Sequence, residues 1–475
     1  MTYPETIRYL ESFINYEKIP AYPYKESLKL ERIKDFLTMI NNPQDSLKCI
    51  HVAGTKGKGS TCAFLTYILR EAGHRVGLYT SPHLSDFRER IRVLGARREG
   101  RQGARREFEG MISKDELMEL VVRLKPTIDE YNKHSKYGPL SFFEVYTSLA
   151  FIYFKEKKVD FAVLETGLGG RLDATNVVKP LVCAITPISY EHTQKLGNTL
   201  REIATEKAGI IKVQGSRFKV QGSIVITAPQ EEEVRKVIRN KCKQVGAKLY
   251  EVGRDVSYRV HGSGFMVQGL AGRYTDLRIR LLGKHQLINA TVAAGVIEAL
   301  RNYNINVNVD SIRAGLYNTV WPGRCEVVSK NPLVVLDGAQ NVASAKVLKE
   351  TIKENFSAES AVGGEGGKYK KLILVLGISS DKDIKGICQE LCPLADEIIL
   401  TQASNPRAAC VDDIEKIIRA QGTCLPAGRT GHRAQVIKSK NVKEAKERAL
   451  HIAKKEDLIL VTGSLFVVGE AREFF

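Results

Sequence analysis

The stretch HVAGTKGKGST (residues 51–61) decides the fold of the N-terminal part of the chain. It is preceded by a short apolar run, LKCIHVA (47–53), and followed by the helix-like TCAFLTYILREAG (61–73) and the strand-like HRVGLYT (74–80). A strand, a glycine loop, a helix and a second strand make one right-handed crossover unit. Phosphate groups bind at such a loop, where it enters the helix.

The residues of this loop have the chemistry that a phosphate requires. Small glycines let backbone N–H groups approach phosphate oxygens, Lys58 supplies a positive charge, and Ser60 or Thr61 can face magnesium. The strict phosphate-loop pattern is not met, because Gly59 separates the lysine from the hydroxyl residue. An ordinary glycine turn before a helix therefore stays open as an alternative.

The whole chain has 475 residues, which predicts two or three domains, and 43% hydrophobic residues, which indicates a globular protein. No apolar stretch is long enough for a membrane span, and the start, MTYPETIRYLESF, lacks the apolar core of a secretion signal. Nine scattered cysteines do not form a disulfide framework. We expect a cytoplasmic protein without a membrane partner.

The net charge of +18 suits a nucleic-acid binder or an enzyme with polyanionic substrates. Much of the excess lies in LGARREGRQGARREFEG (94–110), which predicts a low-complexity, solvated and mobile insertion in a hairpin or loop. Three further segments have the same glycine-rich or basic character: 213–223, 360–371 and 425–433. We interpret all four as surface insertions and do not expect nucleic acid as a partner.

Acidic residues follow a second predicted strand. In KKVDFAVLETGLGGRLDATN (157–176) the apolar strand stops at Glu165 and opens into a glycine loop. A carboxylate at the C-terminal end of a parallel strand beside a phosphate loop can bind the magnesium of a nucleotide. Asp173 is better explained as a cap or brace of the loop. Further along, His192 lies in a loop and Lys207 in the next helix, and alone each is typical of a surface residue.

Taken together and in order, the motifs of the chain resemble those of the folylpolyglutamate synthase and dihydrofolate synthase family, a branch of the Mur ligase superfamily. The resemblance runs from about the first helix to the last residues and is interrupted only by the four insertions. It rests on HVAGTKGKGST, YTSPHL with RERIRV, SFFEVYTSLAF, ETGLGGRLDATNVV, EH with KLGNTLREIATEKAGIIK, HQLINA, WPGRCEVV, VVLDGAQN, ISSDKD and VTGSLFVVGEAR.

This resemblance implies an α/β protein with two domains and the active site in the cleft between them. The N-terminal domain (1–318) is expected to be a phosphate-loop ATPase with a parallel sheet, and the C-terminal domain (319–475) a smaller Rossmann-like ligase domain. The residues agree, since four apolar strands alternate with helical stretches in the C-terminal part: PLVVLD, KLILVLG, EIILT and LILVTG.

The implied activity is ATP-dependent amide ligation between a pterin-linked carboxylate and L-glutamate. The carboxylate belongs to dihydropteroate or to a reduced folate, and the motifs look most like those of bacterial enzymes that use both. The resemblance also implies ATP, two magnesium sites, a carbamylated Lys207 and a monomer. The residues implied in catalysis are Lys58, Lys207 and His192; those implied at magnesium are Ser81, Glu165 and His192; those implied at the nucleotide are Gly54, Thr55, Gly57, Lys58, Gly59, Ser60, Asn289, Arg324, Asp337 and Gln340.

Two residues depart from the family pattern. Lys56 stands where the family usually has asparagine, which adds a charge inside the phosphate loop, and Gln340 stands where it usually has histidine. Glutamine can contact a nucleotide but cannot carry a proton charge.

Three other functions stay open. The first is a Mur-type ligase that acts on a cell-wall precursor, which would need a further domain before the phosphate loop. The second is a basic nucleic-acid-binding ATPase, which leaves the loop around His192 and the Lys207 helix unexplained. The third is a scaffold with an inactive ATPase fold, which does not need the complete set of site residues.

Overall fold

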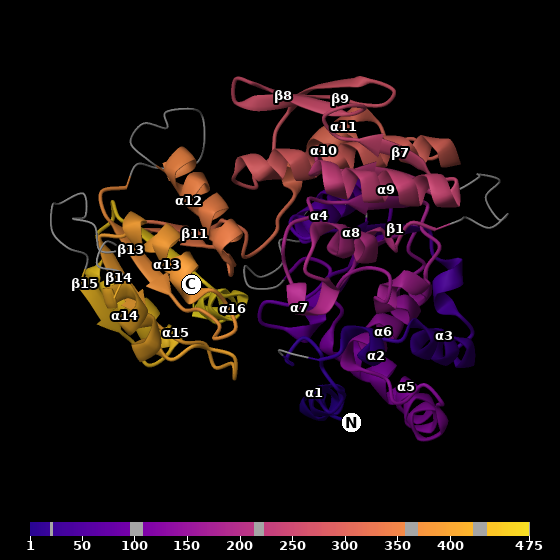
Figure 1. Cartoon of the computed structure of the whole chain (residues 1–475), viewed down its shortest axis with the longest axis horizontal. Coiled ribbons are helices and arrows are strands. Elements are labelled where there is room, and N and C mark those ends of the chain that lie inside the picture. The colour runs from indigo at the N-terminus through magenta and orange to yellow at the C-terminus, as the bar shows by residue number, and fades with distance from the viewer. Residues whose placement is uncertain (20–21, 96–107, 213–222, 357–368, 421–434, 475) are drawn as a thin grey trace. The chain divides into compact units, whose positions relative to one another are not determined.

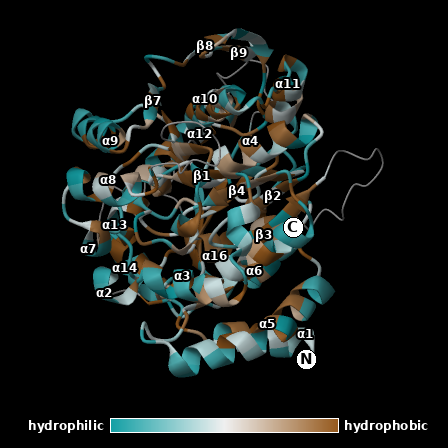
Figure 2. Ribbon diagram, turned by 90° about the vertical axis from the view of Figure 1, so that its right-hand side faces the viewer, coloured by the Kyte–Doolittle hydropathy of each residue, from teal (hydrophilic) through white to brown (hydrophobic). Residues whose placement is uncertain are grey.

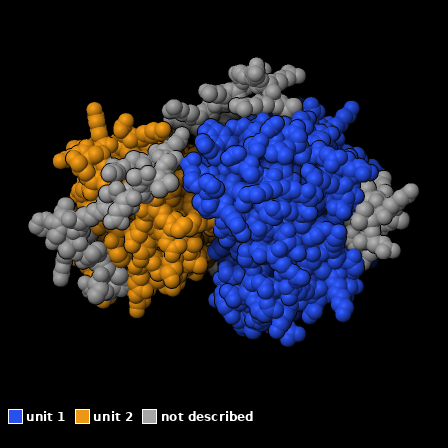
Figure 3. Space-filling view, turned by 90° about the horizontal axis from the view of Figure 1, so that it is seen from above, with its two compact units in different colours: residues 1–83, 87–280, 286–319 blue, residues 84–86, 281–285, 320–475 orange. Residues whose placement is uncertain are grey.

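The computed structural model describes residues 1–19, 22–95, 108–212, 223–356, 369–420 and 435–474, and it divides into two compact units, coloured blue and orange in Figure 3. Unit 1 contains Met1–His83, Phe87–Arg280 and Gln286–Thr319, and unit 2 contains Leu84–Asp86, Leu281–His285 and Val320–Phe475. The four predicted surface insertions lie largely outside the described residues.

Unit 1 is built on a seven-stranded sheet with the order β3-β2-β4-β1-β5-β6-β7, of which Figure 1 labels β1 and β7. All neighbouring strands are parallel except β2 and β3, which are antiparallel. Most of the strands are fully buried, as expected for a sheet covered on both faces. Their bounds are β1 Cys49–Ala53, β2 Val76–Tyr79, β3 Ile91–Leu94, β4 Phe161–Glu165, β5 Val182–Ile185, β6 Ile224–Thr227 and β7 Lys248–Glu251.

The helices of unit 1 begin at clear sequence signals. Ser113, Ser141 and Thr199 each form a capping box with a glutamate three residues later. The bounds are α1 Tyr3–Glu11, α2 Tyr24–Ser27, α3 Leu30–Met39, α4 Lys58–Glu71, α5 Lys114–His134, α6 Phe142–Glu156, α7 Thr193–Leu196, α8 Leu200–Ala208, α9 Glu232–Val245, α10 Lys284–Ala299 and α11 Val309–Asn318. The start of α10, up to His285, is assigned to unit 2.

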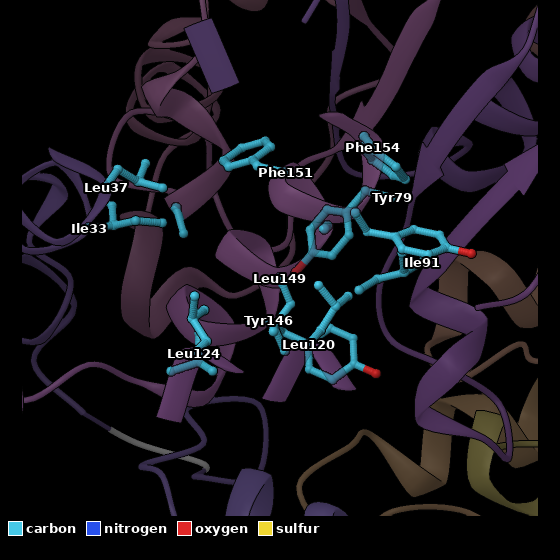
Figure 4. Close-up of a cluster of buried hydrophobic side chains, with 14 of the residues drawn as sticks. Ile33, Leu37, Tyr79, Ile91, Leu120, Leu124, Tyr146, Leu149, Phe151 and Phe154 are labelled. Atoms are coloured by element: carbon cyan, nitrogen blue, oxygen red, sulfur yellow. The ribbon is translucent and has the colours of Figure 1, made fainter. Parts of the chain in front are cut away.

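A large aromatic and aliphatic core joins β2 and β3 to helices α3, α5 and α6 (Figure 4). Its members include Ile33, Tyr79, Leu120, Tyr146 and Phe151, all of them buried. The hydroxyls of both tyrosines are bonded: Tyr79 pairs with Thr147, and Tyr146 donates to the carbonyl of Phe87. This core packs against the end of β2 and so fixes the position of the turn that follows it, which contains Ser81.

Unit 1 also carries a three-stranded antiparallel sheet that the sequence pattern does not predict. Its strands are β8 Ser257–His261, β9 Gly264–Gln268 and β10 Arg273–Leu277. The buried carboxylate of Glu298 on α10 ties this sheet to the unit, because it accepts hydrogen bonds from the Tyr274 hydroxyl (2.7 Å) and from the N–H groups of Leu270 and Ala271.

Unit 2 has a six-stranded sheet with the order β11-β12-β16-β13-β14-β15. Only β11 runs antiparallel, and the other strands form the doubly wound parallel sheet that the sequence predicts. The strands are β11 Glu326–Lys330, β12 Leu333–Leu336, β13 Leu372–Leu376, β14 Glu397–Leu400, β15 Gln435–Lys438 and β16 Leu458–Thr462; the helices are α12 Val342–Phe356, α13 Ile384–Leu391, α14 Val411–Ala420, α15 Val442–Ile452 and α16 Leu465–Phe474. The α/β fold class with parallel sheets in two domains is confirmed.

Hydropathy along the chain follows burial. In Figure 2 the region of β1, β2 and β4 is coloured hydrophobic and α9 is mostly hydrophilic. Among the described helices, none combines the length and the apolar character needed to cross a bilayer.

Candidate active site

The predicted phosphate loop connects the end of β1 to the start of α4, as the sequence indicates. Two of its glycines are required by the backbone and by close neighbours. Gly57 has a φ of 84°, and a Cβ there would lie 2.2 Å from Asn289 Oδ1; Gly54 has a φ of 149°, and a Cβ there would lie 1.9 Å from Thr186 Oγ1. A side chain at either position would push the loop away from its neighbours.

Two lysines point at the same carbonyl of this loop. Lys58 Nζ donates to Gly54 O at 3.2 Å, and Lys207 Nζ donates to the same oxygen at 2.8 Å. Lys207 reaches it from α8, 153 residues away, and is buried. Burial, followed by the repulsion of Lys58, lowers the pKa of Lys207 to about 7. The amine of Lys207 is therefore partly uncharged near neutral pH.

Lys56, the first departure from the family pattern, forms an ion pair with Glu191 at 2.8 Å. Burial acts to raise the pKa of Glu191, but the positive charges of Lys56 and His192 hold it down at about 2. The neighbouring backbone reinforces the same junction, since the N–H groups of Thr55 and Lys56 both donate to Pro187 O. The phosphate loop is thereby fixed to the segment that follows β5.

The family resemblance implies that this loop binds ATP. We expect Lys56→Asn to change the KM for ATP by no more than about threefold, because a partly exposed ion pair contributes little and the Lys56 charge is already neutralised by Glu191. Glu191→Gln, which leaves the Lys56 charge unbalanced, is expected to lower the KM for ATP at low salt and to lose this effect at high salt. Steady-state kinetics at two salt concentrations measures both. A tenfold higher KM for ATP in Lys56→Asn would mean that Lys56 itself holds a phosphate.

Glu165 and Ser81 come from neighbouring strands and lie together. Glu165 is the last residue of β4, and its Oε2 accepts a hydrogen bond from the N–H of Ser81, just after β2, at 3.3 Å. The register pairs Glu165 with Val52, two residues before the phosphate loop. His192 lies beyond the end of β5 with an exposed side chain and a left-handed backbone (φ 53°).

These residues fit a magnesium ion that a nucleotide shares. Within the described residues there is no group of three or more His, Cys, Asp or Glu side chains able to hold a metal without help. Mg²⁺ is usually bound by one or two protein oxygens together with phosphate oxygens and waters. The Glu165 carboxylate and the Ser81 hydroxyl are donors of that kind, whereas the imidazole of His192 is a weaker match for a hard cation.

Asp173 braces the glycine loop that follows Glu165. Its Oδ2 accepts hydrogen bonds from the N–H groups of Gly167 and Leu168, both at 2.9 Å, and burial raises its pKa. Its Oδ1 accepts the N–H and the hydroxyl of Thr175. With four such bonds the carboxylate is occupied by the loop itself, which agrees with the structural role expected from the sequence.

The remaining residues predicted at the nucleotide fall into two groups. In unit 1, Ser60 is buried in the first turn of α4, and Asn289 is buried on α10 with its amide N–H donating to Gln286 Oε1 at 2.9 Å. The Asn289 oxygen faces Gly57, so this side chain lies against the phosphate loop.

In unit 2, Asp337 follows β12, where it accepts N–H groups from Cys325 and Ala339 at 2.8 Å each. Arg324 Nη1 donates to Gly323 O, and the N–H of Gln340 donates to Ser344 Oγ. These three residues cluster at the C-terminal end of β12, the edge where ligands bind in sheets of this type.

Known proteins match the chain over nearly its full length. Models of the Mur ligase middle domain and of the Mur ligase glutamate ligase domain match residues 131–297 and 323–465. A dihydrofolate synthase/folylpolyglutamate synthase of Bacillus subtilis is 33% identical over 94% of this chain and 94% of its own.

Solved structures give the same result. The Mycobacterium tuberculosis folylpolyglutamate synthase complexed with ADP has a TM-score of 0.82 at 28% identity, covering 99% of this chain and 98% of its own. Escherichia coli FolC in complex with DHPP and ADP has a TM-score of 0.76 at 28% identity, covering 100% of this chain and 97% of its own.

Proposed function

The chain belongs to the folylpolyglutamate synthase and dihydrofolate synthase family of the Mur ligases, and we propose that it attaches L-glutamate to both dihydropteroate and reduced folates. It is an ATP-dependent ligase that couples a pterin-linked carboxylate to L-glutamate. The observation that best supports this function is the convergence of Lys58 and Lys207 on the Gly54 carbonyl, in a phosphate loop whose neighbouring strand ends at Glu165.

The reaction must activate a carboxylate that is unreactive at neutral pH. Transfer of the γ-phosphoryl group of ATP to a carboxylate oxygen gives an acyl phosphate and ADP. The amine of L-glutamate then attacks the acyl carbon, an amide bond forms, the bond to the phosphate oxygen breaks, and inorganic phosphate and a proton leave. Phosphoryl transfer depends mainly on positioning and on neutralising charge.

Each proposed role in unit 1 follows from the position of the residue. The backbone around Gly54, Gly57 and Gly59 approaches the phosphates, with Ser60 beside it, whereas Thr55 braces the loop because its N–H already donates to Pro187 O. Among the described residues no side chain caps the start of α4 in competition with a phosphate. Lys58 neutralises the charge that moves during transfer. Asn289, which the family resemblance places at the nucleotide, lies against Gly57 and is suited to supporting the loop there.

We propose that Glu165 and Ser81 hold one magnesium ion and that His192 contacts a second. Bound there, magnesium would neutralise phosphate charge and orient the transferred group. In unit 2, Arg324, Asp337 and Gln340 are proposed to contact the nucleotide, with Gln340 limited to hydrogen bonding. We assign residues 1–318 to the ATP-binding domain and residues 319–475 to the ligase domain. We also propose that the protein is a cytoplasmic monomer. All eight described cysteines are free thiols, as in proteins of a reducing compartment.

Lys207 is proposed to be carbamylated. A carbamate anion forms when an uncharged amine adds to the carbon of CO2 and releases one proton to solvent, and the buried Lys207 amine has its pKa lowered to about 7. The modification replaces an ammonium by an anion, which removes the repulsion from Lys58 and suits a nearby magnesium ion.

We expect the enzyme to lose activity reversibly in CO2-free buffer as the pH falls below about 7, where Lys207 becomes an ammonium that cannot add CO2. Above that pH the neutral amine predominates, so added bicarbonate should restore turnover within minutes. Rates measured with and without bicarbonate across this pH range test the expectation. Lys207→Arg, which cannot be carbamylated, is the control and should show no bicarbonate response; a wild-type rate insensitive to bicarbonate at every pH would contradict the carbamate.

The function is tested by ADP release from the purified protein with magnesium ATP and L-glutamate, comparing dihydropteroate, tetrahydrofolate and no acceptor. Glutamate-dependent ADP release with both dihydropteroate and tetrahydrofolate supports the bifunctional ligase. ADP release with only one of the two acceptors restricts the activity to that substrate. Release without a pterin that is stimulated by RNA or DNA would instead support a nucleic-acid-dependent ATPase and reject the ligase.

A further inference from the structure

His51 is a fully buried histidine of β1 to which the proposed reaction gives no role. It lies three residues before Gly54, and its Nε2 is 2.8 Å from Thr175 Oγ1. Thr175 is equally buried and is 124 residues away in the sequence. Among the described residues the other ring nitrogen, Nδ1, has no hydrogen-bond partner, so Thr175 is the partner that orients this buried ring.

The direction of each hydrogen bond follows from the chemistry of the three side chains. Thr175 Oγ1 lies 2.5 Å from Asp173 Oδ1, and an ionised carboxylate can only accept, so the threonine hydroxyl donates its proton there. The threonine oxygen must then accept from His51, which places the imidazole proton on Nε2. Burial lowers the pKa of His51 to about 3, so the ring is neutral and keeps this tautomer.

The chain of bonds ends on the loop after Glu165. Asp173 Oδ2 accepts the N–H groups of Gly167 and Leu168 at 2.9 Å, which fixes the two residues that follow Thr166. The N–H of Thr166 donates to Val52 O on β1 at 3.0 Å. The segment from Thr166 to Thr175 is therefore hydrogen-bonded to β1 at both ends: Thr166 bonds to Val52 and Thr175 to His51. Strand β1 leads into the phosphate loop.

The same loop is fixed to the helix that carries Lys207. The N–H of Arg171 donates to Glu206 O at 2.8 Å, and the Arg171 guanidinium pairs with the Glu206 carboxylate. A Cβ at Gly170 would lie 2.9 Å from both Glu206 O and Lys207 O. The loop therefore approaches α8 so closely that a larger residue at position 170 would clash with these carbonyl oxygens. The loop after Glu165 therefore connects the end of β4 to the part of α8 that carries Lys207.

We propose that His51, Thr175 and Asp173 are positioning residues that set the distance between the Glu165 carboxylate and the Lys207 side chain, and through it the affinity for magnesium. The inference rests on the proposed roles of Glu165 and Lys207. It assigns no contact with substrate to the three residues themselves. Residues that orient metal ligands from behind usually change metal affinity or activity by about 10- to 100-fold when replaced.

The test compares Thr175→Val, which keeps the shape and removes the hydroxyl, with Thr175→Ser, which keeps the hydroxyl. The readout is binding of a fluorescent ATP analogue during a magnesium titration, together with kcat and the KM for the pterin. Thr175→Val should raise the magnesium concentration at half-maximal binding about tenfold and lower kcat by a similar factor, with the pterin KM unchanged. Thr175→Ser should stay close to wild type.

His51→Gln retains an N–H donor near Nε2 and should be milder than His51→Leu. Thr351→Val is the matched control, since Thr351 on α12 in unit 2 is also buried and its hydroxyl donates within its own helix, to Val347 O. A folded Thr175→Val protein with wild-type magnesium dependence would overturn the inference, and so would equal losses in Thr175→Val and Thr175→Ser.

Failure of the proposed function would be seen separately. In that case wild-type protein would release no glutamate-dependent ADP, whereas the magnesium titration of nucleotide binding would still show whether Thr175→Val shifts the midpoint.

Discussion

Lys58→Ala is expected to lower glutamate-dependent ADP release about 10³-fold and to leave the fold intact. Lys58 is the first residue of α4, and its ammonium donates to Gly54 O within the phosphate loop rather than to the core. Alanine removes a charge that stabilises the transferring phosphoryl group, and removal of one such fixed group typically costs about 10²- to 10³-fold in kcat. Single-turnover ADP formation measures the loss, and circular dichroism checks the fold.

The matched control is Lys236→Ala, which removes an exposed lysine from the surface helix α9. It should retain full turnover, because it removes the same charge at a distance from the loop and alanine is a good helix former. A folded Lys58→Ala protein with more than about a tenth of wild-type turnover would mean that another group supplies the charge, and the assignment of Lys58 would be wrong.

The architecture could be predicted from the sequence where apolar runs are bounded by clear signals. The strands that end at Ala53 and Glu165 are continuous apolar runs followed by glycine loops, and both form parallel strands of the central sheet. The small sheet of β8, β9 and β10 was missed, because its outer face is polar and exposed and its strands depend on packing against α10 through Glu298. Strand β15 was missed for a similar reason, since QVIK (435–438) is an edge strand without a buried face of its own.

The candidate site divides along the same line. Lys58 and Glu165 could be proposed from the sequence pattern because each lies next to a strand end or a glycine loop, whereas Ser81 was proposed only from the family resemblance. The pairing of Lys56 with Glu191 could not, since it depends on how two loops 135 residues apart meet at the edge of the sheet. His51 gave no signal at all, because a histidine within an apolar strand looks the same in the sequence whether or not it meets a threonine such as Thr175.

Electrostatic balance explains why the loop tolerates its unusual charge. Lys56, Lys58 and Lys207 lie close enough for the first two to lower the pKa of the third. Glu191 offsets part of this charge, and its ion pair directs Lys56 toward the segment after β5. An additional lysine in a phosphate loop is therefore compatible with nucleotide binding when a partly buried carboxylate such as Glu191 pairs with it.

Glu165→Gln is expected to reduce turnover by about 10³-fold or more at any magnesium concentration. Glutamine has nearly the same shape as glutamate but no negative charge, so it supplies a poor ligand where magnesium is proposed to bind. A metal ion stabilises the charge of a transferring phosphoryl group by several kcal/mol, and each ~1.4 kcal/mol is a factor of about ten in rate. The measurement is kcat across a magnesium titration, together with the thermal midpoint of the folded protein.

Glu298→Gln is the control that separates chemistry from stability. Glu298 is also a buried carboxylate that accepts N–H groups, but its partners brace the small sheet of β8, β9 and β10. Weakening hydrogen bonds to a buried charge should lower the free energy of unfolding by about 1–3 kcal/mol while turnover persists. Glu165→Gln should show the opposite pair of results, lost turnover with an unchanged or higher midpoint, because functional residues are commonly kept at a cost in stability. If both variants lost stability and activity together, Glu165 would be a structural acid and the magnesium site would have to lie elsewhere.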